Sequence, residues 1–510
     1  MLKFFQWMTL IYAYSKEVCI LKSGDRKTFK FLCIFSCLYL LPLIIANSYY
    51  IDDIGRFSTT NFLWIRDGRP LMQIIAACFG FGKPYLDIFP ISQLLSAFIF
   101  NYTLILWGKR YLTIKNSFLM AAFLGLSYLN LFLLESFSYV YESLGMMLAL
   151  CLPIFLYSLS NRLPFINKFF LTLFFVILSL SLYQASIGAY VELALIELCH
   201  ALLANSSQQQ NLKQFIIRLL GIIVGTVFYM VIIAHPLLKG YGAERSSLLP
   251  LFTDSGYRQM MRHIFIYYSR YQIFFHSTHK IIRILYLFIY IGGTGIVLKK
   301  LWCNANKNMF TKSIYSCLFV FLPAILLVGS VIPFALLKAP VFAPRMYLSF
   351  TVFFMYMAIL LYQLELKFPF AMIVLIPMIL FGLSFSAGYG NLLYHENQHD
   401  QYIAQSIAND LNQLENQQNK IYKKITFIGK EPECLELKRQ KVKRPLMAIY
   451  MNNDWLWGST YLDHYRKTRT SLESKKTEDT LLIDTHSALS RNEFYDFYDA
   501  GNKAIVVFRD

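Results

Sequence analysis

The chain has 510 residues, of which 56% are hydrophobic and only 15% are charged. This composition excludes a soluble multidomain protein and predicts an α-helical protein that crosses a membrane many times. The net charge of +18 arises in residues 1–387, which hold 31 basic and 13 acidic residues, whereas residues 388–510 hold 17 of each. We therefore predict a membrane domain over 1–387 and a small soluble α/β domain over 388–510.

A helix needs about 20 mostly apolar residues to cross the hydrocarbon core of a bilayer. By that criterion the sequence predicts about eleven spans. They are expected at residues 31–48, 88–107, 117–134, 140–160, 168–183, 186–203, 215–234, 280–298, 314–333, 346–364 and 369–387.

Basic residues gather in every second short loop, at residues 16–30, 109–115, 162–168 and 299–312. The positive-inside rule places these loops in the cytoplasm. With eleven spans, the N-terminus is then expected in the cytoplasm and the C-terminal domain on the outer side. We assign the basic surplus to this topology and expect no nucleic acid partner.

The first outer loop, at about 49–87, begins with the adjacent carboxylates Asp52 and Asp53, followed by Arg56. Adjacent carboxylates repel each other, which favours protonation of one of them unless a cation compensates. A carboxylate in that setting is a candidate general base. The alternative is a solvated helix cap that satisfies backbone donors.

Further along the same loop, the stretch from Asp67 through Gly68 and Arg69 to Pro70 has the composition of a turn that leads into a helix.

A second pair of acidic residues, Glu135 and Glu142, brackets a short outer turn and is a candidate for binding sugar hydroxyls.

Two glutamates, Glu192 and Glu197, lie inside a predicted span. An unpaired charge at that depth costs at least about 2.5 kcal/mol. We expect each to form hydrogen bonds within the bundle in its neutral form.

The second large outer loop, at about 235–280, departs from the positive-inside rule because it is rich in lysine and arginine. Arg258 and Arg262 lie one turn apart on a predicted interfacial helix over 257–275. Cations on the outer side indicate an anionic partner such as a lipid phosphate, with simple headgroup contact as the alternative.

The last outer connection runs from Lys338 to Arg345, where the next span begins. An anion bound at that helix N-terminus would satisfy both the arginine and the free backbone donors. A snorkelling arginine is the alternative.

The segment His395-Glu396-Asn397-Gln398-His399 matches the H-E-x-x-H signature of zinc peptidases. The polar residues within and after it favour a solvated helix, and no third ligand follows closely. We therefore predict no metal site and no cofactor.

In the C-terminal domain, we predict a helix over 395–414 and strands at 425–428, 446–451, 481–483 and 504–508. Trp455 and Trp457 lie in a stretch of amides and a carboxylate. Such mixtures bind carbohydrate, because indole faces cover the apolar side of a sugar. A tryptophan pair in the core is the alternative.

The segment Tyr49-Tyr50-Ile51-Asp52-Asp53-Ile54-Gly55-Arg56, followed by Asp67-Gly68-Arg69-Pro70-Leu71, resembles the Gtr type II glucosyltransferases, which glucosylate O-antigen and convert serotype. The Ala343-Pro344-Arg345 connection and the outer C-terminal domain are also similar to that family. Its members resemble GT-C membrane glycosyltransferases in architecture.

The resemblance implies a polyprenyl (undecaprenyl) phosphate-glucose donor and an O-antigen or other lipid-linked glycan acceptor, at the periplasmic face of the bacterial inner membrane. A polyprenyl-phosphate glucosyltransferase and a flippase would supply the donor. It also implies that Asp52 or Asp53 acts as the base. Basic residues would hold the donor phosphate, at positions that we assign to Arg56, Arg69, Lys338 and Arg345.

Sugar contacts are assigned more loosely, to residues of the outer segments. These are Asp67, Glu135, Glu142, Arg258, Arg262, Trp455 and Trp457. An O-antigen polymerase is the nearest alternative function, and a multi-span transporter or flippase and a membrane zinc peptidase are more distant ones.

Overall fold

The computed structural model divides the chain into two compact units. The helical unit comprises Met1–Leu41 and Leu63–Ser386, and the C-terminal unit comprises Pro42–Phe62 and Ala387–Asp510. The structure describes residues 19–58, 63–82, 86–159, 163–203, 207–303, 308–451, 458–476, 479, 482–483, 485, 487–501 and 503–509.

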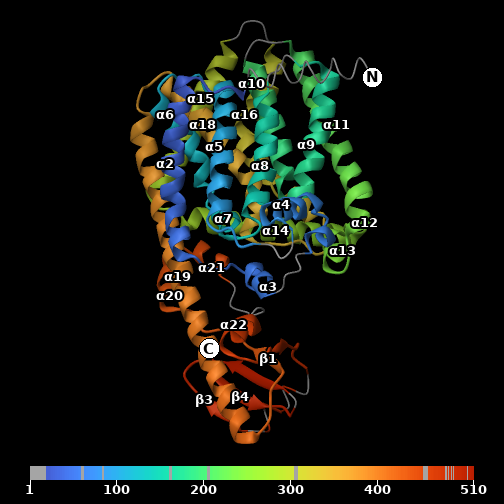
Figure 1. The fold of residues 1–510 in the computed structure, drawn as a ribbon. Helices are drawn as coiled ribbons and strands as arrows, with labels where there is room; N and C mark the ends of the chain where they lie inside the picture. Colours follow the sequence, from blue (N-terminus) through green and yellow to red (C-terminus); the bar gives the residue numbers. More distant parts are fainter. Residues whose placement is uncertain are drawn as a thin grey trace. The chain divides into compact units, whose positions relative to one another are not determined.

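Within these residues, nine helices are long and apolar enough to cross a membrane, which supports the predicted multi-pass protein (Figure 1). Six are single α-helices, and two of these, α2 and α19, have residues in both units. The six are α2 (Ser23–Ala46), α5 (Ile91–Tyr111), α9 (Phe165–Leu182), α15 (Lys280–Trp302), α16 (Met309–Gly329) and α19 (Ala371–Gln418). The other three are η3 with α10 (Gln184–Leu203), α11 to α12 (Gln208–Leu237) and η5 with α18 (Pro344–Glu365).

The predicted count of eleven is not confirmed, because the segments expected at 117–134 and 140–160 form shorter helices. The first is split into α6 (Ser117–Gly125) and the 3-10 turn η2 (Leu126–Leu129), and the second is α8 (Ser143–Ser158). Asn130 ends the first helix, because its buried side chain donates to Tyr347 O at 3.1 Å and Thr351 Oγ1 at 3.0 Å. Polar bonds to a distant helix thus replace a continuous apolar span.

Segments predicted on the outer side meet at one end of the helical unit, where α4 (Pro70–Gly80), α7 (Leu133–Ser138), α13 (Tyr241–Ser246) and α14 (Asp254–Ser277) lie (Figure 1). Arg69 contacts Glu142 at 3.3 Å, and Glu135 contacts Arg345 at 2.8 Å. These contacts fit the predicted alternation of spans, and which end faces the cytoplasm stays a prediction.

The two glutamates of α10 (Ile187–Leu203) differ, and the expectation of a neutral, hydrogen-bonded side chain is met by neither. Glu197 is not merely hydrogen bonded, since its carboxylate forms ion pairs with Arg110 at 2.7 Å and Arg218 at 3.2 Å. Glu192 is fully buried, and neither of its oxygens has a hydrogen-bond partner within the described ranges. Their five-residue spacing places them on different faces, and cations from neighbouring helices reach only one face.

The helix predicted at 257–275 lies within α14 (Asp254–Ser277), and its faces differ in exposure. Its place at the membrane interface stays a prediction. The buried residues recur every three or four positions and include His263, Tyr267 and Tyr271. Arg262 and Phe265 are exposed, and the exposed Arg258 pairs with Asp254 one turn earlier. The helix is therefore amphipathic, as the sequence predicts.

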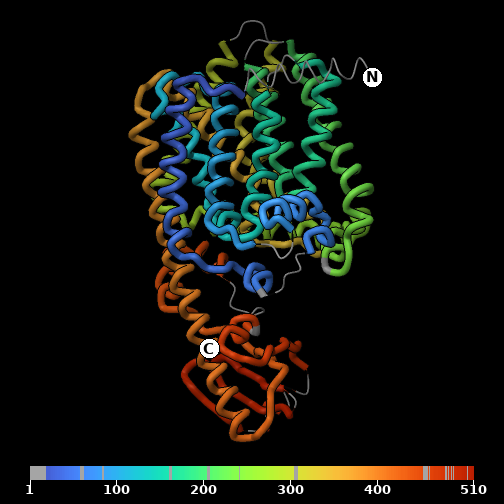
Figure 2. Tube along the Cα trace, in the orientation of Figure 1, coloured from blue at the N-terminus to red at the C-terminus, as the bar shows by residue number. Residues whose placement is uncertain are grey.

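The C-terminal unit contains a five-stranded sheet in the order β2-β1-β5-β4-β3. Figure 1 labels three of its strands, and Figure 2 traces the same part of the chain in orange and red. The strands are β1 (Lys424–Ile428), β2 (Ser471–Leu472), β3 (Ser490–Arg491), β4 (Tyr495–Asp499) and β5 (Ala504–Phe508). β1 pairs in parallel with β2 and β5, and β4 pairs antiparallel with β3 and β5. The predicted α/β unit is confirmed, with strands at 425–428 and 504–508.

The last part of α19 covers this sheet with an apolar stripe at helical spacing. Ile403, Ile407, Leu411 and Leu414 share one buried cluster with residues of β1, β4 and β5. The helix predicted at 395–414 is therefore part of a longer one. Its core contacts are repeated at i and i+4, as an amphipathic helix on a sheet requires.

Two strand predictions in this unit are wrong. Residues expected as a strand at 446–451 form the helix α21 (Leu446–Tyr450), after α20 (Leu435–Lys443) and before α22 (Gly458–Tyr465). Pro445 lies at the N-cap of α21 with helical backbone angles, which favours a helix over a strand. At 481–483, the two described residues are helical.

Candidate functional site

The predicted turn at Gly68 is present and places Arg69 at the end of the helical unit. The 3-10 helix η1 (Trp64–Asp67) ends at Gly68, which has the left-handed φ of 75°. Tyr229 Oη donates to Gly68 O at 2.7 Å. A Cβ on Gly68 would lie only 3.0 Å from the hydroxyl oxygen of Tyr229. Only glycine meets both constraints without strain.

Arg69 is held by three side chains from two separate helix starts, Glu142 at the N-cap of α8 and Tyr183 with Gln184 at the start of η3 (Gln184–Ser186). Its guanidinium donates to Gln184 Oε1 at 3.0 Å and to Glu142 Oε2 at 3.3 Å. It also lies over the ring of Tyr183, 4.7 Å from the centroid. The other oxygen of Glu142 accepts from Trp64 Nε1 at 2.6 Å. A buried carboxylate, an amide and an aromatic face thus fix the orientation of the arginine.

Arg345 is held in a similar way at the start of η5 (Pro344–Phe350). Its guanidinium donates to Glu135 Oε1 at 2.8 Å, and its backbone N–H donates to the other oxygen of Glu135. The ring of Tyr139 lies 5.3 Å from the guanidinium carbon. An anion at this helix start was expected, and the protein's own Glu135 occupies that position.

These contacts form two matched sets, each with one arginine, one buried glutamate and one tyrosine. Glu135 and Glu142 are 1% and 3% exposed, so both carboxylates are removed from water. Their negative charges equal the positive charges of Arg69 and Arg345, and the sum is zero. The arrangement therefore offers oriented N–H donors for an anionic group without an excess of charge.

Other predicted binding residues of the helical unit do not join these two sets. Lys338 is exposed, and its backbone N–H donates to Ser247 O at 2.9 Å. Arg258 and Arg262 are exposed on α14. Asp67 is half-buried, and its carbonyl oxygen accepts from Gln184 Nε2 at 2.9 Å.

The adjacent carboxylates begin the helix α3 (Asp52–Ser58) of the C-terminal unit. Arg56 lies 3.8 Å from a carboxylate oxygen of Asp52 and 3.8 Å from one of Asp53. The side chain of Asp52 is 37% exposed, whereas that of Asp53 is fully buried. The cation expected to compensate the pair is therefore in place, and the two carboxylates differ in access.

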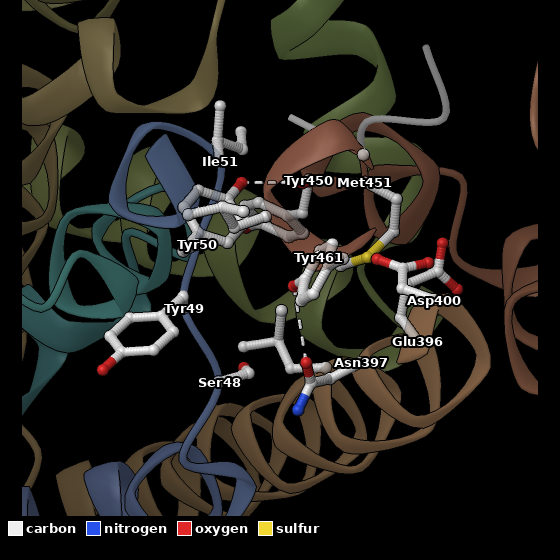
Figure 3. A pocket seen from close by; sticks show the side chains of 13 residues that line it. Ser48, Tyr49, Tyr50, Ile51, Glu396, Asn397, Asp400, Tyr450, Met451 and Tyr461 are labelled. Carbon is white, nitrogen blue, oxygen red and sulfur yellow. Dashed lines mark hydrogen bonds between the residues drawn. The ribbon is translucent and has the colours of Figure 1, made fainter. Parts of the chain in front are cut away.

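A cavity of about 70 Å³ lies in the C-terminal unit beside this segment (Figure 3). Its aromatic lining comes from Tyr49, Tyr50, Tyr450 and Tyr461. Tyr50 Oη donates to Tyr450 O at 2.7 Å, and Tyr461 Oη lies 3.5 Å from Asn397 Oδ1. Rings with polar tips around a small hollow suit a sugar, whose faces are apolar and whose rim carries hydroxyls.

Acidic residues and a histidine gather at one wall of the cavity. Glu396 and Asp400 line it, one turn apart on α19 (Figure 3). His399 Nδ1 lies 3.6 Å from Glu431 Oε1. Ligand atoms of His399, Asp400 and Glu431 all lie within 4.8 Å of one another.

Burial and the neighbouring carboxylates raise the pKa of Asp400 and of Cys434. Removal from water, and then the charges of Glu431 and Glu396, raise the pKa of Asp400 well above its usual range. Burial and a hydrogen bond with Glu396 raise the pKa of the Cys434 thiol to about 12. By contrast, His395 of the H-E-x-x-H segment is exposed and is not part of the cluster.

Sequence reasoning missed several of these residues, and Trp455 and Trp457 lie outside the described residues. The missed residues are Trp64, Tyr139, Tyr183, Gln184, Asp400, Glu431 and Tyr461. Asp400 carried a usable signal, since it directly follows the H-E-x-x-H segment, and acidic residues recur near Glu431. The aromatic and amide residues resemble many others in a chain with 35 tyrosines.

Comparison with known proteins identifies a family and a relative from a phage. A family model described as glucosyl transferase GtrII matches residues 41–362. A relative from Salmonella phage P22 is 26% identical over 502 residues, covering 95% of this chain and 99% of the relative. It is described as an uncharacterized 55.3 kDa protein in the gtrB 5′ region. No solved structure matches. The matched range contains both arginine sets and the adjacent carboxylates.

Proposed function

The chain belongs to the GtrII glucosyl transferase family, and we propose that it transfers a glucosyl residue from a polyprenyl phosphate to O-antigen repeats. The transfer takes place at the periplasmic face of the bacterial inner membrane and modifies serotype. The observation that carries this proposal is the pair of arginines, each oriented by a buried glutamate and a tyrosine. Such donors suit a lipid-linked phosphate, the leaving group of this reaction.

The proposed reaction is one displacement at the anomeric carbon, as in GT-C-like enzymes. The acceptor hydroxyl oxygen forms a bond to that carbon while the bond from carbon to phosphate oxygen breaks. The electron pair of the broken bond leaves with the polyprenyl phosphate, and the hydroxyl proton passes to a carboxylate. The configuration at the anomeric carbon is therefore inverted.

We assign the base to Asp52 in preference to Asp53. A general base must come within hydrogen-bond reach of the acceptor hydroxyl. The side chain of Asp52 is 37% exposed and that of Asp53 is buried. In this assignment, Asp53 and Arg56 form an ion pair beside Asp52 and hold the start of α3 in place.

We assign the donor phosphate to Arg69 and Arg345. The contacts of Arg69 with Gln184 and Glu142 use two of its five N–H donors, and its side chain is 22% exposed. Glu135 and Glu142 then position the arginines and do not bind sugar hydroxyls. The tyrosine-lined cavity is the candidate site for a sugar of the acceptor glycan.

The test is carried out in an O-antigen-bearing host that supplies polyprenyl-phosphate-glucose and its flippase. Mass spectrometry of lipopolysaccharide repeats compares the wild type with Asp52→Asn, Asp53→Asn and the control Asp87→Asn. We expect one added hexose per repeat in the wild type and control, and none in Asp52→Asn at equal protein level. Hexose retained by both variants of the adjacent pair would contradict the assignment of the base.

The same experiment separates this function from polymerisation of O-antigen. A transferase adds a side branch, so the mass of each repeat rises and the ladder of chain lengths keeps its distribution. A polymerase changes the ladder and leaves the mass of the repeat constant. Longer chains without added hexose would therefore exclude the proposed function.

A further inference from the structure

We propose that His399, Asp400 and Glu431 bind a divalent transition-metal ion at the wall of the tyrosine-lined cavity. Their ligand atoms lie within 4.8 Å of one another. Atoms that share one ion lie about 2.0–2.6 Å from it, so trans ligands are about 4–5 Å apart. The three side chains can therefore meet one ion with small changes in rotamer.

The cluster comes from two separate parts of the unit. His399 and Asp400 are consecutive on α19, whereas Glu431 follows β1. Glu431 is 3% exposed, and Glu396, which lies one turn before Asp400, is 8% exposed. Three carboxylates, those of Glu396, Asp400 and Glu431, thus interact with one another in a place with little water. A bound cation would offset their repulsion, as a shared proton also would.

Two ligand atoms of the cluster are available. His399 Nδ1 and Asp400 Oδ1 are both shielded from solvent, and neither atom has a hydrogen-bond partner in the part of the chain that the structure describes. The carboxyl group of Asp400 also interacts with that of Glu431. The contact of His399 with Glu431 is 3.6 Å long, which exceeds a hydrogen bond. A metal ion would satisfy both atoms at once.

The donor set indicates the class of metal. One imidazole nitrogen with carboxylate oxygens suits Mn²⁺ or Zn²⁺, whereas Ca²⁺ and Mg²⁺ prefer oxygen alone. Three protein ligands leave coordination positions open, as in sites that also bind a substrate or water. Because Asp400 lines the cavity, those positions would be accessible to a hydroxyl group of a ligand there. Only this last step depends on the proposed function.

This site differs from the zinc-peptidase site that the H-E-x-x-H segment suggests. A peptidase of that type binds metal through both histidines of the motif. Here His395 is exposed, and the ligands besides His399 are Asp400, the next residue, and Glu431, which follows β1. His395 is therefore a matched control on the same helix.

The test uses the full chain, purified in detergent, stripped with EDTA and dialysed against Mn²⁺ or Zn²⁺. Inductively coupled plasma mass spectrometry measures bound metal, and titration gives the affinity. We expect one ion per chain, with affinity reduced at least about tenfold in His399→Gln, Asp400→Asn and Glu431→Gln. His395→Gln should bind as the wild type does. Size-exclusion chromatography confirms that each variant is folded.

Several results would overturn the proposal. They are no bound metal in the wild type, unchanged affinity in all three ligand variants, or an equal loss in His395→Gln. The last result would point to the peptidase motif. Because this experiment measures bound metal, it can refute the metal site even if glucosyl transfer is confirmed. It can likewise confirm the metal site even if glucosyl transfer is refuted.

Discussion

Replacing Glu142 by glutamine should disable Arg69 without removing it. The carboxylate lies 3.3 Å from the guanidinium, which gives a gross attraction of about 5 kcal/mol at an effective dielectric constant of about 20. Loss of one partner from a buried pair costs about 3–5 kcal/mol. Glutamine still accepts from Trp64, and Arg69 is 22% exposed. We therefore expect a net loss of about 2–3 kcal/mol.

If the whole of this loss falls on the stabilisation of the departing phosphate in the transition state, the transfer rate falls roughly 30- to 150-fold. The assay is hexose addition by membranes, with protein level measured by immunoblot. Arg69→Gln should be at least as impaired, and the double variant no worse than Arg69→Gln, because the two residues act as a unit. The control Asp254→Asn breaks an exposed pair and should change the rate less than about threefold. If the loss of rate in the double variant, expressed as free energy, equalled the sum of the losses in the two single variants, the two residues would not act as a unit and the reasoning would be refuted.

Two further predictions concern stability, read as the thermal unfolding of detergent-purified protein. Glu197→Gln removes the carboxylate shared by the buried Arg218 and the partly buried Arg110 and should cost about 3–5 kcal/mol. Glu192→Gln on the same helix breaks no ion pair among the described residues and should cost less than about 1 kcal/mol. Equal shifts would contradict this. Gly68→Ala should cost about 1–3 kcal/mol because of its positive φ, and Gly295→Ala, where a Cβ has open space, should be neutral or stabilising. A neutral Gly68→Ala would show that the turn adapts.

Hydropathy predicted most of the helical unit because a membrane span requires a long apolar segment whatever its tertiary contacts. The rule failed at 117–134, where the segment is apolar enough but the chain leaves the helix at Asn130. That break depends on a carbonyl and a hydroxyl of η5 and α18, more than 200 positions away. A single sequence holds no signal for such a pairing.

The sequence indicated which charged residues belong to the candidate site. It did not indicate which of them form ion pairs with one another. Arg69, Glu142 and Arg345 are charged residues at the ends of apolar segments, and position alone made them candidates. That Arg69 meets Glu142, and Arg345 meets Glu135, follows from helix packing over separations of 73 and 210 residues. The sequence therefore suggested phosphate binding by all four cations, whereas in the structure each of these two arginines is already paired with a carboxylate.

This pairing has a kinetic consequence for the glutamates. A substitution such as Glu135→Gln removes a negative charge, which strengthens the attraction of the site for an anionic donor. It also frees Arg345 from its fixed orientation, which weakens the donors aimed at the departing phosphate. The first effect lowers KM and the second lowers kcat. We therefore expect kcat to fall with KM unchanged or reduced, whereas a glutamate that bound the sugar hydroxyls directly would raise KM when replaced.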